Sequence, residues 1–284
     1  MLTNQTSSGL VSERHMSYKR MKFKIKPRLR ILATILVGAQ LSLATPVFID
    51  QFNTDQAVGT LTAAGTSSHS QQNVGAAEVL GAFRILDARF ITGANGRKLD
   101  FQTEGAPLND LTLNSANGVT GSGLATYCGS LTCGTAAFNG TIGTVTPTSF
   151  GLGGVDLTSG GTNTQIQIIG NSDQIVTIRA TFYISSTVYA RGSFTIPGDI
   201  ATHVYQLKFD NSGNTPFTYA GGANSSLFTQ VNAVTFMIQG SDSSDTFISY
   251  FGADNAPEPA TFGMLGAGLG GLLWFARKRA QAKS

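Results

Sequence analysis

The stretch Ile175–Ile184, which reads IVTIRATFYI, decides the fold. Apolar side chains fall at every second position, and threonine, arginine and tyrosine occupy most of the positions between them. The apolar positions that share one side are Val176, Ile178, Ala180, Phe182 and Ile184. Successive side chains of a β-strand point to opposite faces, so this alternation predicts a strand with one face in a core.

The same period of two continues on both sides of this strand. Further strands are expected at Phe83–Ile91, Lys98–Thr103, Asp110–Leu113, Gln165–Ile169, Val188–Ile196, Val204–Phe209, Ala233–Gln239 and Thr246–Phe251. Glycine, asparagine and serine separate them, and no stretch has the periodicity of an amphipathic helix. The pattern predicts an all-β ectodomain over residues 45–256, an antiparallel, jelly-roll-like β-sandwich. A β-helix is the alternative, but no fixed-period repeat supports it.

Residues 1–44 are predicted to be an N-terminal extension followed by a signal peptide. A basic stretch, Met21–Arg30, precedes the apolar run Ile31–Ala44. Ser42 and Ala44 are small residues three and one positions before the expected cleavage after Ala44. The alternative is a membrane helix, but the run has 14 residues and spanning needs about 17–25.

Residues 257–284 contain three parts in a fixed order. These are Pro257, Glu258 and Pro259, then the uncharged run Ala260–Ala276, then Arg277, Lys278 and Arg279. A run of 17 residues makes a helix of about 25 Å, just enough for a thin bilayer. The basic cluster favours a cytoplasmic C-terminus. A transmembrane helix is therefore expected, with the preceding domain outside the membrane.

This end of the chain resembles the PEP-CTERM sorting signal of Gram-negative bacteria. The resemblance implies recognition by an exosortase-type enzyme, transient residence in the inner membrane and cleavage near the Pro257-Glu258-Pro259 tripeptide. It also implies transfer to the cell envelope or extracellular matrix, with exopolysaccharide as a candidate partner. The alternative is a plain single-pass anchor without processing.

Part of the middle region resembles a recurring type of PEP-CTERM ectodomain that has no assigned activity. The stretches that carry this resemblance are Ile49–Phe52, Gly151–Thr158 and Val231–Gly240, with Asp245 before the last strand. The resemblance implies a fold and a location without a chemistry.

Charge argues against nucleic acid as a partner. Charged residues make up only 12% of the chain, and 34 residues are glycine. Although the net charge is +3, the basic residues gather at the two ends of the chain. At the N-terminal end, translation starts at Met1 or, by hypothesis, at Met21. Between Ala44 and Pro257 seven basic and fourteen acidic residues give a formal charge of −7. Nucleic-acid-binding domains normally carry a basic patch instead.

Cys128 and Cys133 are the only cysteines of the chain. In an oxidising, exported environment this pair favours a disulfide, with free thiols as the alternative. A metal site would need two more ligands, and the only histidines after residue 44 are His69 and His203, far apart in sequence. No metal and no cofactor are therefore expected.

Acidic and hydroxyl side chains do not define a catalytic site. The densest cluster of acidic residues contains Asp242 and Asp245. These side chains could bind Ca²⁺ or belong to a solvated turn. The turn is preferred because the EF-hand pattern is absent. Asp156 and Asp173 are interpreted in the same way. No G-x-S-x-G nucleophile elbow is present, so no catalytic residue is assigned.

Three functions stay open at this point. The first is a non-enzymatic surface or matrix protein, the second a glycan-binding module and the third a polysaccharide hydrolase. An exposed aromatic row would favour the second, and Tyr183 and Tyr189, which flank a turn, are its candidates. A cleft with two facing carboxylates would favour the third.

Overall fold

The computed structural model describes residues 45–133, 138, 140, 145–213 and 215–255. Several predicted features lie outside these residues: the signal peptide with Ser42 and Ala44, the tripeptide Pro257-Glu258-Pro259, the transmembrane helix, and Arg277, Lys278 and Arg279. Within the described part of the chain, no helix is long and apolar enough to cross a membrane.

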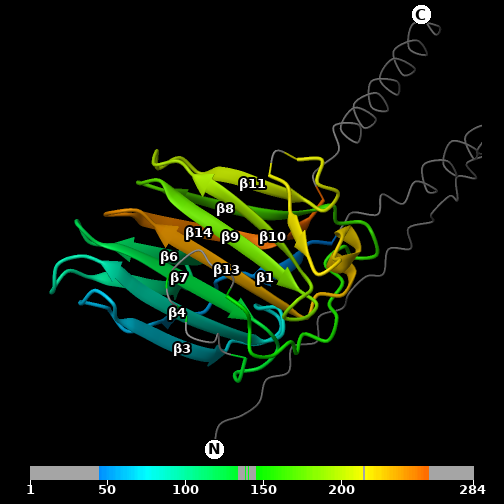
Figure 1. Ribbon diagram of the computed structural model, residues 1–284, viewed down its shortest axis with the longest axis horizontal. Helices are drawn as coiled ribbons and strands as arrows, with labels where there is room; N and C mark the ends of the chain where they lie inside the picture. Colours follow the sequence, from blue (N-terminus) through cyan, green and yellow to red (C-terminus); the bar gives the residue numbers. More distant parts are fainter. Residues whose placement is uncertain (1–44, 134–137, 139, 141–144, 214, 256–284) are drawn as a thin grey trace, which may run out of the picture. The chain divides into compact units, whose positions relative to one another are not determined.

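Two antiparallel sheets of seven strands each make up the fold (Figure 1). Sheet A has the order β11-β8-β14-β6-β5-β2, and β1 also pairs with β14. Its strands are β1 (Val47–Asp50), β2 (Gln56–Ala57), β5 (Leu99–Glu104), β6 (Asp110–Ser115), β8 (Gln165–Ser172), β11 (His203–Lys208) and β14 (Asp245–Asp254). The predicted all-β, antiparallel fold class is confirmed.

Sheet B has the order β12-β10-β9-β13-β7-β4-β3. Its strands are β3 (Ser67–Asn73), β4 (Phe83–Thr92), β7 (Thr120–Tyr127), β9 (Val176–Tyr183), β10 (Tyr189–Ile196), β12 (Thr218–Ala220) and β13 (Ala233–Gly240). The one helix among the described residues is the short 3-10 helix η1 (Ser225–Thr229).

The apolar faces of the two sheets meet in one core. Phe236 of β13 and Phe251 of β14 bring their rings to a centroid distance of 4.6 Å across the interface. Phe182, in the stretch with the clearest alternation, packs against Phe228 of η1 at 5.4 Å and is fully buried. Burying each such ring stabilises the fold by about 1.5–3 kcal/mol, so the period-two pattern is also the pattern of the core.

Strand β7 was not expected from the sequence because glycines interrupt its apolar pattern. A Cβ at Gly123 would lie 2.3 Å from the ring of Phe101, and one at Gly121 would lie 2.5 Å from Leu99. Both contacts cross from sheet B to β5 of sheet A. The sheets therefore approach one another closely here because β7 has no side chains at these positions.

A buried ion pair joins the two sheets. Arg84 of β4 donates from Nη1 to Oδ1 of Asp50 in β1 at 2.9 Å, and neither side chain is exposed. The Tyr127 hydroxyl donates to Asp50 Oδ2 at 3.0 Å. Arg84 also donates from Nε to Gln56 Oε1 at 2.9 Å and from Nη2 to the Thr54 carbonyl at 2.7 Å. Such extensive pairing is what a buried charge requires.

The ionisation of this pair is finely balanced. Burial raises the pKa of Asp50 to about 6, while the charge of Arg84 and the N–H of Phe52 act in the opposite direction. Burial also raises the pKa of the Tyr127 phenol well above its usual value, and the neighbouring carboxylate of Asp50 adds to this. Because these groups are enclosed, they join the sheets and do not contact a ligand.

Candidate functional site

A groove with a volume of about 430 Å³ lies at one end of the sandwich. Three segments form it: the glycine-rich chain before β8, the turn after β11, and η1. The lining residues are Asp156, Thr158, Gly160, Gly161, Asn163, Thr164, Phe209, Asp210, Ser225 and Thr229. Backbone hydrogen bonds from Leu157 N–H to the Phe228 carbonyl, 2.8 Å, and from Phe209 N–H to the Thr164 carbonyl, 3.0 Å, hold the segments together.

Phe209 provides the aromatic part of the groove. Its ring stacks on that of Phe228 with the centroids 4.2 Å apart and the planes at 23°. Phe209 is 7% exposed, so only an edge or part of a face reaches the groove while the rest packs in the core. The backbone carbonyl of Phe209 accepts a hydrogen bond of 2.9 Å from the Tyr219 hydroxyl, which fixes this segment.

Asp156 shapes one side of the groove. Its Oδ1 accepts from the backbone N–H of Thr158 at 2.8 Å and from the Thr158 hydroxyl at 2.5 Å, and its Oδ2 accepts from Gly160 N–H at 2.9 Å. Burial alone would raise the pKa of Asp156, but these hydrogen bonds together hold it below its usual range. The Asp156 side chain is therefore ionised at neutral pH and keeps the loop in place.

Asp210 provides a second, exposed carboxylate. The backbone N–H of Ser212 donates to its Oδ1 at 2.9 Å. That hydrogen bond, and a smaller effect of the Lys208 charge, lower the pKa of Asp210. The groove thus has two ionised carboxylates at neutral pH.

Asn163 is the least satisfied polar group of the groove. It is 2% exposed, and its Nδ2 donates to the carbonyls of Leu157 at 3.1 Å and Thr45 at 3.4 Å. Its Oδ1 has no hydrogen-bond partner among the described residues. A buried acceptor without a partner is unfavourable, so this atom is a natural receptor for a donor that enters the groove.

Both ends of the described chain meet beside the groove. Strand β1 pairs antiparallel with β14, Val47 opposite Ala253. The Thr164 hydroxyl donates to Asn255 Oδ1 at 3.3 Å, and Thr164 N–H donates to the Asp254 carbonyl at 3.1 Å. The groove therefore lies next to the point where the chain leads into its last thirty residues.

A second depression, of about 230 Å³, lies at the other margin of sheet A beside β2 and β5. Its lining includes Asp55 and Glu104 but no aromatic side chain. Asp55 Oδ1 accepts from Gly105 N–H at 2.6 Å, which already fixes this loop. The end groove is the better candidate because it combines an aromatic ring with polar groups.

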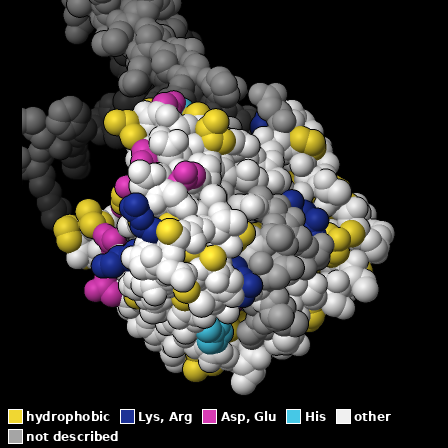
Figure 2. All heavy atoms as spheres, turned by 60° about the vertical axis from the view of Figure 1, so that its left-hand side comes forward, with side chains coloured by type: hydrophobic (Ala, Val, Ile, Leu, Met, Phe, Trp, Pro, Cys, Tyr) yellow, Lys and Arg dark blue, Asp and Glu magenta, His cyan; other side chains and the backbone are white. Residues whose placement is uncertain are grey.

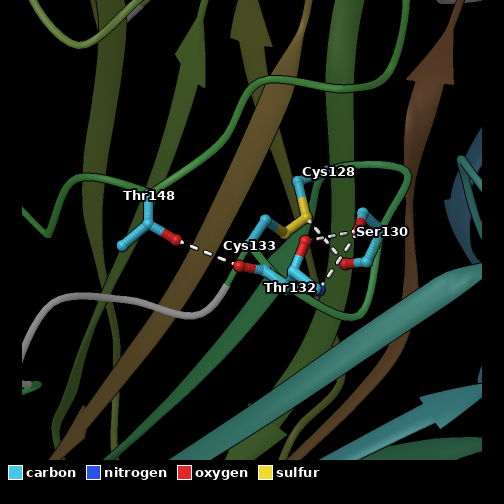
Figure 3. Close-up of a disulfide and its surroundings, with 5 residues drawn as sticks. All are labelled: Cys128, Ser130, Thr132, Cys133 and Thr148. Carbon is cyan, nitrogen blue, oxygen red and sulfur yellow. Dashed lines mark hydrogen bonds between the residues drawn. A yellow bond between two sulfur atoms is a disulfide. The ribbon is translucent and has the colours of Figure 1, made fainter.

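The cysteines predicted to pair form a disulfide, Cys128–Cys133, with their Cα atoms 6.2 Å apart (Figure 3). Nearby, Ser130 and Thr132 exchange a hydroxyl hydrogen bond of 2.8 Å, and the Thr148 hydroxyl donates to the Thr132 carbonyl at 3.3 Å. The disulfide packs on the outer face of sheet B with Ile85, Tyr183 and Ala233, and neither cysteine lines the groove.

The tyrosine pair expected at an exposed edge does not form an exposed row, because Tyr183 is buried and Tyr189 is half-buried. Tyr183 is fully buried, its ring 5.7 Å from that of Tyr189 and 6.0 Å from that of Phe150. Its hydroxyl donates to the Val145 carbonyl at 2.5 Å. Val145 and Phe150 lie against Tyr183 on this side of sheet B, and period-two alternation cannot reveal such contacts.

The histidines lie on different sheets. His69 of β3 places Nδ1 2.7 Å from Asp87, and His203 of β11 places Nε2 2.8 Å from Asp199. Strands β3 and β11 are edge strands of sheets B and A. In the described part of the chain, no group of three or more His, Cys, Asp or Glu residues could hold a metal ion.

The remaining acidic candidates lie in turns at the end opposite the groove. Asp242 accepts from Gly118 N–H at 2.6 Å, and Asp173 accepts from Asp245 N–H at 2.6 Å. Burial, and then the charge of Asp173, raises the pKa of Asp245. On the face in Figure 2, hydrophobic, basic and acidic side chains are scattered among the backbone and the remaining side chains.

Sequence comparison identifies the end of the chain. The family model of the PEP-CTERM protein-sorting motif matches residues 255–279. The end of the chain thus carries a PEP-CTERM protein-sorting motif, as exosortase substrates do, and the resemblance seen in this part of the sequence is confirmed. This motif implies export and sorting to the cell surface. No curated protein matches the sequence.

Comparison with solved structures gives only distant likenesses. An agarase is similar at 9% identity with a TM-score of 0.36; the match covers 60% of this chain and 22% of the agarase. The family 11 carbohydrate-binding module of a cellulosomal cellulase of Clostridium thermocellum is similar at 10% identity with a TM-score of 0.34, over 76% of this chain and 97% of the module. At these values the likenesses assign no ligand and no activity to this chain.

Proposed function

We propose that this protein is a non-enzymatic component of the cell surface or extracellular matrix that binds a glycan through the end groove. The observation that carries the proposal is that Asn163, whose Oδ1 has no partner among the described residues, lines one groove together with Phe209 and the carboxylates of Asp156 and Asp210. Exopolysaccharide is the glycan that a sorted surface protein meets first.

This combination suits the chemistry of a sugar. A pyranose has apolar C–H faces, which pack on an aromatic ring, and a rim of hydroxyl donors. Hydroxyls that donate to ionised carboxylates form stronger hydrogen bonds than neutral pairs do. The rim of the groove also has four hydroxyls. Those of Thr158, Thr164 and Thr229 already donate within the protein and can accept from a ligand, and that of Ser225 adds a fourth polar group.

A hydrolase is the competing function because the groove contains two carboxylates. Hydrolysis of a glycoside needs one carboxyl that stays protonated near neutral pH as the general acid. The pKa values of Asp156 and Asp210 are both lowered, by the hydrogen bonds that each accepts. Neither is suited to that role, and this favours binding over catalysis.

The test uses the processed protein recovered from cells and exopolysaccharide isolated from the same cells. We expect co-sedimentation with the polysaccharide and no release of reducing ends during prolonged incubation. Thr229→Val and Ser225→Ala together remove two exposed rim hydroxyls and should weaken retention, whereas Ser67→Ala, at an exposed position of β3 in sheet B, should not. Absence of retention would contradict binding, and release of reducing ends that Asp210→Asn abolishes would establish a hydrolase instead.

A further inference from the structure

The charge of the groove restricts which glycan it can accept. Its ten lining residues include two carboxylates and no Lys, Arg or His. Both carboxylates are ionised at neutral pH because hydrogen bonds lower their pKa values. The nearest positive charge acting on Asp210 is Lys208, a half-buried neighbour on β11. A ligand therefore meets a groove with an excess of negative charge.

Most of the groups that have spare capacity are acceptors. Oδ1 of Asn163 has no hydrogen-bond partner among the described residues. The exposed carboxylate of Asp210 accepts from the backbone N–H and the side chain of Ser212 and can accept further hydrogen bonds. The side-chain Nδ2 of Asn163 already donates to two backbone carbonyls, those of Thr45 and Leu157. A matching ligand consequently donates several hydrogen bonds and carries positive charge.

We infer that the groove binds a glycan with free amino groups, such as a polymer of hexosamine units that lack their N-acetyl groups; this inference rests on the glycan-binding function proposed above. The ammonium group of such a sugar offers three donors and a charge of opposite sign to Asp156 and Asp210. Its C–H groups contact the small exposed part of the Phe209 ring, as those of any pyranose would. Uronic, sulfated and phosphorylated glycans are repelled by the same two carboxylates.

The experiment measures calorimetric binding of the processed protein to three oligosaccharides of equal length. These are a glucosamine oligomer, its fully N-acetylated form and a galacturonate oligomer, each at low and at high salt. We expect the glucosamine oligomer to bind about tenfold more tightly than the acetylated one, and the galacturonate oligomer not to bind. High salt should reduce this preference because it screens exposed charges.

Two variants distinguish binding by the groove from attraction to the overall negative charge of the ectodomain. Asp210→Asn keeps the Oδ1 acceptor for Ser212 N–H but loses the charge, and should weaken glucosamine binding about fivefold. Asp242→Asn removes the same charge at the opposite end, keeps its acceptor for Gly118 N–H, and should leave binding unchanged. Equal losses in both variants would show attraction to the whole surface and would overturn the inference.

The remaining outcomes distinguish the two proposals. If the acetylated oligomer binds as tightly as the amino form and salt has no effect, the amino-sugar preference is wrong while glycan binding stands. If none of the three oligosaccharides binds and exopolysaccharide is not retained either, both proposals fail.

Discussion

Arg84 in sheet B donates from Nη1 to both carboxylate oxygens of Asp50 in sheet A, at 2.9 and 3.1 Å, with no part of either side chain exposed. Asp50 is the last residue of β1, the first strand of the ectodomain. The ion pair therefore joins the beginning of the folded chain to the opposite sheet, and its loss should affect both sheets together.

Replacing the cation should be strongly destabilising. Arg84→Met leaves the Asp50 carboxylate buried without its counter-ion, and we expect the free energy of unfolding at pH 7 to fall by about 3–5 kcal/mol. Urea denaturation followed by fluorescence measures this. Arg97→Met, at an exposed position, is the matched control and should change stability by less than about 0.5 kcal/mol. A loss for Arg84→Met as small as that of the control would contradict the described pairing.

The pH dependence of stability should reveal Asp50. Burial raises the pKa of Asp50 from its ordinary value of 3.8 to about 6 in the folded protein. A raised pKa means that the folded state binds the proton more tightly, so the contribution of Asp50 is fully present below pH 3.8 and is lost as pH rises through about 6. We expect a loss on the order of 1–3 kcal/mol across this window.

The difference in unfolding free energy between the wild type and Asp50→Asn isolates this effect, since asparagine does not titrate. As pH rises from 4 to 7, the unfolding free energy of the wild type should fall relative to that of Asp50→Asn, whatever the difference between them at pH 4. The lowered pKa values of Asp156 and Asp210 affect stability at more acidic pH and in the opposite direction. If the difference stays constant, or if the wild type gains stability relative to the variant as pH rises, the charge of Arg84 outweighs burial in its effect on the pKa of Asp50.

The glycines of β7 should resist substitution. Gly123→Ala places a Cβ 2.3 Å from the Phe101 ring, and we expect a loss of roughly 1–3 kcal/mol. Gly59→Ala, whose Cβ would have its nearest contact at 3.5 Å, should be nearly neutral. Thermal unfolding of the two variants checks this. If Gly123→Ala is as stable as Gly59→Ala, the sheets do not pack as closely as described.

The disulfide should stabilise the fold modestly because it closes a short loop. Reduction of Cys128–Cys133, which are five residues apart, should lower the unfolding free energy by about 2 kcal/mol on the chain-entropy model. Denaturation with and without reductant measures the loss, and the variant with serine at both positions should not respond to reductant. Alkylation of the native protein without prior reduction would show free thiols and contradict the bond.

The sequence predicted the fold class and the main strands because apolar alternation and the core obey the same period of two. All nine expected strands exist, with ends displaced by three residues at most. Strand β7 was not predicted because Gly121 and Gly123, at which the opposite sheet approaches closely, interrupt its apolar alternation. Strand β3, SSHSQQN, was not predicted because an edge strand needs no apolar face.

The groove was less predictable than the fold. Asp156 was a candidate, but Phe209, Asp210 and Asn163 were not, since each comes from a segment whose neighbours are fixed only by tertiary contacts. Phe209 was included in an expected strand, and nothing in the local pattern distinguishes a core phenylalanine from one that reaches a groove. The unpartnered acceptor on Asn163 is likewise a property of packing.

The central claim is that this chain is sorted to the cell surface by its PEP-CTERM signal, and the most direct test is the intact mass and cellular fraction of the mature protein. The account predicts a product that begins at Thr45, ends near Pro257 and leaves the membrane. Glu258→Gln should retain the tail and remain in the membrane fraction, whereas Glu104→Gln in the ectodomain should be processed normally. A wild-type product that keeps Trp274 and stays in the membrane would contradict the claim.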